Sequence, residues 1–178
     1  AQLGIGFNKP ESAAVALDSL LLHHQNEMGA ETSIGMAALQ GMNFLNLDMY
    51  EQAGEVGENL VNALKNSVPF EALYSFVFIE KIGKALANMP KPYLERPNQD
   101  VTVPLSVETV GRGKHIYIPV EVNGVRKNYI FDTGCSFGNF VSEKYAEEAG
   151  LKIVADSIPV SGMEIGFVKL ATADSMKI

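Results

Sequence analysis

The chain has 178 residues, a formal net charge of −7 and a hydrophobic content of 47%, which together indicate a folded protein with one good core or two small ones. Neither half carries the surplus of Lys and Arg that nucleic acid or an anionic membrane surface requires, so both are excluded as expected partners. A single cysteine excludes an intramolecular disulfide and a CxxC metal or redox site.

The segment from Pro10 to Asn88 has apolar residues at spacings of three and four and few clusters of β-branched residues, which predicts helices. Asp48 and Glu51 have the spacing of a capping box, so Asp48 is expected to cap a helix. Four helices are predicted, with these bounds: Pro10 to Met28-Gly29, Glu31 to Asn46, Asp48 to about Asn66, and Ser67-Pro69 to the Met89-Pro90 stop.

Short turns between these helices predict antiparallel helical hairpins. The stretch from Leu47 to Ala53 resembles the entry to the second helix of a tetratricopeptide repeat, and a plain helical bundle is the equal alternative because no clean 34-residue period is found. Gly35 and Ala38 are expected to let paired helices approach closely. Gly54 and Gly57 are interpreted as helix-packing positions rather than a phosphate loop, since no strand precedes them.

A proline-rich segment separates two kinds of pattern. Residues 1–89 are expected to form a helical domain, residues 90–100 a linker, and residues 101–178 a β domain with one short helix. The predicted fold class is therefore α+β and multidomain, with an all-α N-terminal part and an all-β C-terminal part.

Short β runs follow the linker. Asn123-Gly124 is the strongest hairpin signal, because both central positions of a type I′ turn need a positive φ. Ser142 is expected to cap a short helix that Gly150 ends. The predicted strands are Val101 to Leu105, Ser106 to Val110, His115 to Val122, Val125 to Phe131, Asn139 to Val141, Leu151 to Val154, Ile158 to Val160 and Phe167 to Ala171.

The returning strand of the hairpin runs into Phe131-Asp132-Thr133-Gly134. This apolar-Asp-Thr-Gly sequence, with a hairpin before it and a strand and short helix after it, resembles the retropepsin-type aspartic peptidases over roughly residues 103–178. The resemblance implies a retropepsin-like half-barrel with a catalytic loop at Asp132, Thr133 and Gly134. It also implies a substrate-binding flap, for which the candidate residues are Gly162, Met163, Glu164, Ile165 and Gly166.

Two carboxylates that share one proton can both activate a water and protonate the leaving group, so the implied activity needs no cofactor and no metal. The chain has only one Asp-Thr-Gly, and the second Asp is expected from a homodimer partner or from an unseen second lobe. Family subunits continue past the flap to an apolar segment that ends in Gly. No such segment is found before Ile178, so the half-barrel is expected to be incomplete and the 178 residues alone inactive.

Two other functions remain open. The β half could be a degenerate peptidase scaffold in a non-catalytic protein-binding module, or the Asp-Thr-Gly could be a simple turn in a scaffold. Cys135 is interpreted as a small buried hydrophobe rather than a nucleophile, and His23, His24 and His115 have no ligand-spaced companions.

The expected partner is a peptide or protein substrate. No apolar run approaches the roughly 20 residues that cross a bilayer. A first residue of Ala1 suits a processed export product and a trimmed chain equally, and a periplasmic or secreted location is favoured over a cytoplasmic one.

Overall fold

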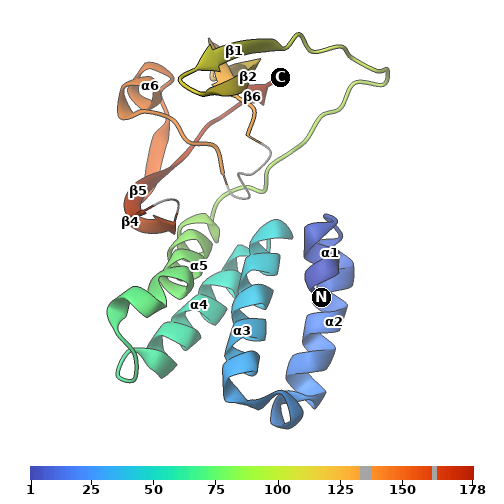
Figure 1. Cartoon of the computed structure of the whole chain (residues 1–178), viewed down its shortest axis with the longest axis vertical. Coiled ribbons are helices and arrows are strands. Elements are labelled where there is room, and N and C mark those ends of the chain that lie inside the picture. The colour runs from blue at the N-terminus through green and yellow to red at the C-terminus, as the bar shows by residue number, and fades with distance from the viewer. Residues whose placement is uncertain (133–137, 162–163) are drawn as a thin grey trace. The chain divides into compact units, whose positions relative to one another are not determined.

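The computed structural model describes residues 1–132, 138–161 and 164–178 (Figure 1). These residues form an α+β chain in which five α-helices precede antiparallel β structure and a sixth lies between the strands. The chain divides into two compact units: Ala1–Pro92 with Val154–Leu170, and Tyr93–Ile153 with Ala171–Ile178. The first unit therefore also holds residues 154–170, which the sequence pattern grouped with the β domain. Among the described residues, no helix combines the length and the apolar character needed to cross a membrane.

The helices of the first unit are close to those predicted, with one addition and one shifted boundary. The short helix α1 was not predicted, and the first predicted helix ends at His23 rather than at Met28-Gly29. Gly29, with φ 76° and ψ 169°, kinks α3, and the regular part beyond it corresponds to the predicted helix from Glu31. The elements are α1 Gln2–Gly6, α2 Pro10–His23, α3 Gln25–Asn46, α4 Tyr50–Leu64, the 3₁₀ turn η1 Phe70–Leu73, and α5 Tyr74–Leu86.

The capping box predicted at the start of α4 is wrong. Met49 is the N-cap residue and no side chain caps the helix. Asp48 has a φ of +54° and accepts a hydrogen bond of 2.7 Å from the Tyr50 hydroxyl. The Asp48 carboxylate therefore binds the tyrosine hydroxyl and caps no amide of the first turn.

Glycines set the distance between α4 and α5. A Cβ at Gly57 would lie 2.7 Å from Glu80 Cα, and a Cβ at Gly83 would lie 2.6 Å from Gly54 Cα, so the two backbones are in direct contact. This confirms Gly54 and Gly57 as packing positions. The role expected for Gly35 is wrong, because a Cβ there would meet nothing within 4 Å.

The buried side chains of helices α2 to α5 and the turn η1 are aliphatic with one polar exception. Asn43, which is fully buried, donates from Nδ2 to Pro10 O at 2.9 Å and so ties α3 to the first residue of α2. The apolar core consists of Ala13, Leu17, Leu45, Ala53, Leu60, Leu73, Val77, Ile79 and Ile82.

Strands β4 (Lys152–Ser161) and β5 (Ile165–Thr172) form a two-stranded sheet, visible as the red hairpin in Figure 1. The sequence pattern divided this region into three shorter runs. Ile158 is only 1% exposed, which shows that the hairpin has a buried face.

The sheet of the second unit contains β1 (Ser106–Val110), β2 (Gly113–Val122), β3 (Val125–Ile130) and β6 (Met176–Lys177). Strand β2 pairs antiparallel with each of the other three. The predicted turn is confirmed, since Asn123 and Gly124 have φ of 50° and 84°. The strands predicted at 101–105 and 139–141 are absent.

Helix α6 (Glu143–Glu148) starts and ends as predicted. Ser142 Oγ accepts a 3.2 Å hydrogen bond from Tyr145 N–H, and Gly150 has the left-handed φ of 62° that ends a helix. Tyr145 and Ala149 of this segment pack with Val120 and Val122 in the core of the unit. The helix is therefore fixed against β2 and β3, and Asp132 lies two residues after the end of β3.

Asn123 links three segments of the second unit. Its Nδ2 donates to Ala149 O at 2.8 Å, and its Oδ1 accepts from Asp174 N–H at 2.9 Å and from Ser175 N–H at 3.0 Å. Asn123 therefore forms the hairpin turn and also binds the end of α6 and the segment before β6.

We expect Asn123→Gly to lower the free energy of unfolding by about 2 kcal/mol, because it removes three hydrogen bonds but tolerates the positive φ. Asn123→Ala should cost about 3 kcal/mol, because it adds backbone strain to the same loss. Urea denaturation of both variants measures the difference. Equal stability of Asn123→Ala and the unsubstituted protein would contradict this role.

Candidate functional site

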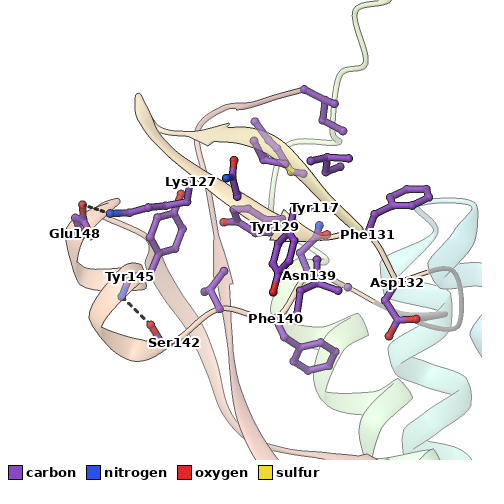
Figure 2. A pocket seen from close by; sticks show the side chains of 18 of the residues that line it. Tyr117, Lys127, Tyr129, Phe131, Asp132, Asn139, Phe140, Ser142, Tyr145 and Glu148 are labelled. Carbon is purple, nitrogen blue, oxygen red and sulfur yellow. Dashed lines mark hydrogen bonds and ion pairs between the residues drawn. The ribbon is translucent and has the colours of Figure 1, made fainter. Parts of the chain in front are cut away.

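A groove of about 860 Å³ opens in the second unit. Its walls come from β2, β3, the segment 138–142, α6 and the last residues of the chain, and five aromatic side chains line it: Tyr117, Tyr129, Phe131, Phe140 and Tyr145 (Figure 2). Phe131 and Phe140 are 52% and 58% exposed, so large apolar surfaces remain open to a ligand or a partner.

Asp132 lies at one end of this groove (Figure 2). The backbone hydrogen bonds of the β2–β3 hairpin extend one residue past β3, because Phe131 N–H donates to Ile116 O at 2.8 Å. Asp132 follows at once. Its position is therefore set by the hairpin register, in which Tyr117 pairs with Ile130. The other predicted catalytic-loop residues, Thr133 and Gly134, lie outside the described residues, as does Cys135.

The opposite end of the groove is polar. Lys127 Nζ and Glu148 Oε1 form an ion pair of 3.0 Å, with each side chain about half exposed. Figure 2 shows this pair at the far end from Asp132. Asp132 and Glu148 are the two carboxylates among the described residues that line the groove. They do not form a close pair, so the described part of the groove offers a single carboxylate at its Asp132 end.

Tyr129 and Tyr145 form the wall beside the ion pair. Their rings meet edge to face with centroids 5.9 Å apart. The Tyr145 hydroxyl donates to Val125 O at 2.9 Å. The Tyr129 hydroxyl is buried and has no hydrogen-bond partner within the described ranges. Burial raises the pKa of Tyr129 above its usual value, and the neighbouring Tyr145 hydroxyl adds to the shift.

We expect Tyr129→Phe to be neutral or to stabilise the protein by up to about 1 kcal/mol, because it removes a buried hydroxyl that lacks a partner. The matched variant Tyr145→Phe should destabilise by about 1 kcal/mol, because it leaves Val125 O without its donor. Thermal unfolding followed by circular dichroism compares the two. A larger loss for Tyr129→Phe than for Tyr145→Phe would show that Tyr129 has a hydrogen bond of its own.

The flap candidates fall in the other unit. Glu164 lies in a bend, and Ile165 and Gly166 begin β5. Gly162 and Met163 lie outside the described residues. The groove is lined by residues of the second unit, so the described structure does not bring the flap candidates into it.

The sequence singles out Asp132, which lines the groove, but it does not predict the aromatic lining. Tyr117 and Tyr129 were read only as strand residues, and Phe140 was placed in a strand that does not form. In the described parts of the chain, no three His, Cys, Asp or Glu side chains are grouped so that they could hold a metal ion.

No protein-family model, curated protein or solved structure matches the chain. Function is therefore inferred from the residues of this chain.

Proposed function

We propose that the chain is part of an aspartic peptidase in which Asp132 is one of two catalytic carboxylates. The observation that carries the proposal is the position of Asp132, directly after the last paired residue of a β-hairpin and at the end of an apolar groove. The Asp-Thr-Gly sequence in this setting supports the same reaction.

The chemistry requires a second carboxylate within hydrogen-bonding reach of the same water. One carboxylate of such a pair takes a proton from the water, while the other, protonated, donates to the carbonyl oxygen of the substrate. Glu148 is unsuited to this role because it is paired with Lys127 at the other end of the groove. The second carboxylate is therefore assigned to a second copy or a second lobe.

The proposed substrate is a peptide or protein segment in extended conformation. Strand β3 is at the end of its sheet order and has no further strand partner among the described residues. Its free edge and the aromatic side chains beside it suit an extended segment, which would add backbone hydrogen bonds and insert apolar side chains. The same edge would equally accept a strand of the partner that supplies the second carboxylate.

The test is cleavage of an unfolded protein substrate, followed by mass spectrometry of the products, with and without a pepstatin-type inhibitor. Inhibitor-sensitive cleavage by the assembled protein is the expected result. If the protein binds the unfolded substrate but does not cleave it at any protein concentration tested, the peptidase proposal is wrong. The alternative function, a protein-binding module, would then be favoured.

A further inference from the structure

A second cavity, of about 300 Å³, opens on the sheet of the second unit. It lies where β1 ends and the chain before β1 leaves β2. Its walls come from that preceding segment and from β1, β2 and β3, and they include Pro104, Leu105, Tyr117, Pro119, Arg126 and Asn128.

Two prolines account for the cavity. The pairing of β1 with β2 stops at Ser106 and Tyr117, and the same register would next place Pro104 opposite Pro119. Ile116 O faces β3, where it accepts from Phe131 N–H, so Pro119, three residues on, faces β1. Neither proline has an N–H to donate across this gap. The segment before Ser106 therefore diverges from β2 and leaves a space between them.

Arg126 supplies the cavity with a cation. Its side chain is exposed and makes no hydrogen bond or ion pair with any residue that the structure describes. Glu121 lies directly opposite on β2, but its Oε1 is paired with Lys177 Nζ at 3.5 Å. These three charged groups together carry one excess positive charge, which a single monoanionic group would neutralise.

The remaining lining suits a carboxylate attached to a short apolar stem. The planar guanidinium of Arg126 can bind both oxygens of a carboxylate, and the Asn128 amide, two residues along the same face of β3, adds a further donor. Pro104 and Leu105 offer apolar surface to the stem, and Leu105 is 61% exposed. A dianionic phosphate fits less well, because the site has only one excess positive charge.

The cavity adjoins the groove that ends at Asp132. Tyr117 and Asn128 line both. An extended peptide along the free edge of β3 would pass Asn128, so one of its residues would come within reach of Arg126.

We propose that this cavity binds a carboxylate of the peptide that occupies the groove, with Arg126 as its bidentate partner and Asn128 as a second donor. The carboxylate belongs to an acidic side chain or to the chain end of the peptide. The proposal rests on the proposed function for the peptide, but it concerns binding and selection, not the reaction.

The test measures fluorescence anisotropy of labelled nine-residue peptides on full-length Asp132→Asn protein, which leaves the peptides uncut. Two amidated peptides differ only in Glu or Gln at one position, and a third has Gln and a free C-terminal carboxylate. Arg126→Gln should weaken binding of the Glu peptide, the free-carboxylate peptide or both at least about tenfold, and should change binding of the amidated Gln peptide less than about twofold. The peptide that responds identifies the source of the carboxylate.

Arg112→Gln is the matched control, because Arg112 is an exposed arginine of the β1–β2 turn that does not line the cavity. It should change none of the three affinities. Arg126→Lys should restore only part of the binding, because lysine keeps the charge but lacks the planar pair of donors.

Equal losses for all three peptides in Arg126→Gln, or the same losses in Arg112→Gln, would overturn the proposal. Displacement of the peptide by inorganic phosphate at a lower concentration than by propionate would show a phosphate site instead. Absence of binding by every peptide would also overturn it. Cleavage by the unsubstituted protein is measured separately, so failure of the peptidase proposal and failure of the carboxylate site are distinguishable.

Discussion

Asp132→Asn is expected to lower peptidase turnover of the assembled protein by at least about 1,000-fold, because an amide cannot accept the proton of the attacking water. Asn has nearly the shape of Asp, and Asp132 is exposed at the end of the hairpin. The fold should therefore survive the change, with unfolding free energy within about 0.5 kcal/mol of the original. Cleavage rate and thermal unfolding, measured on the same preparation, separate the two effects.

The control is Asp100→Asn, which removes a carboxylate from an exposed position before the sheet. Its activity should equal that of the unsubstituted protein. Full activity of Asp132→Asn would remove Asp132 from the mechanism. A loss of activity accompanied by unfolding would indicate that the carboxylate is structural and would favour the scaffold interpretation.

Local signals in the sequence predicted the features that depend on local chemistry. Asn123-Gly124 forms its turn because two adjacent residues must adopt positive φ, and few residue pairs do so at low cost. Ser142 caps α6 because its hydroxyl reaches an amide three residues on. Each of these two features is determined by residues that are close in sequence: Asn123 and Gly124 are adjacent, and Ser142 binds the amide of Tyr145. The sequence alone therefore contains the information that each feature needs.

Most of the failed predictions concern elements that need a partner distant in sequence. Residues 101–105 and 139–141 have strand-like composition, but a strand forms only where another strand edge accepts its hydrogen bonds. The groove lining was missed for this reason too, since it combines β2, β3, the segment 138–142 and α6. Asp48 is a local exception: it has capping-box spacing, but the Tyr50 hydroxyl two residues on binds its carboxylate.

The β4–β5 hairpin shows most directly what the sequence pattern cannot predict. Alternating apolar residues indicated strands in this region, but periodicity does not state which surface a strand will cover. The contacts that place the hairpin with α5 involve Lys81 and Tyr74, which are about 75 and 93 residues away in sequence from their partners. The positive φ of Ser157 carries no sequence signal, because serine is not typical of that conformation.

Two glycine substitutions test how the helical unit is packed. Gly57→Ala is expected to lower the free energy of unfolding by at least about 2 kcal/mol, because overpacking against backbone cannot be relieved by a side-chain rotation. The added Cβ would lie 2.7 Å from Glu80 Cα and 2.8 Å from Phe76 O, so α4 and α5 would have to move apart.

Gly35→Ala is the matched control, since it makes the same change within a helix at an exposed position with nothing within 4 Å of the new Cβ. It should stabilise the protein by about 0.5–1 kcal/mol, because alanine loses less backbone entropy than glycine when a helix forms. Urea denaturation midpoints should therefore move in opposite directions for two chemically identical substitutions. If Gly57→Ala is as stable as Gly35→Ala, the close approach of α4 and α5 is wrong.

Hydrogen exchange of the β4–β5 hairpin in Gly57→Ala tests whether α5 supports β4 and β5. If it does, displacement of α5 should also accelerate the exchange of residues 154–161.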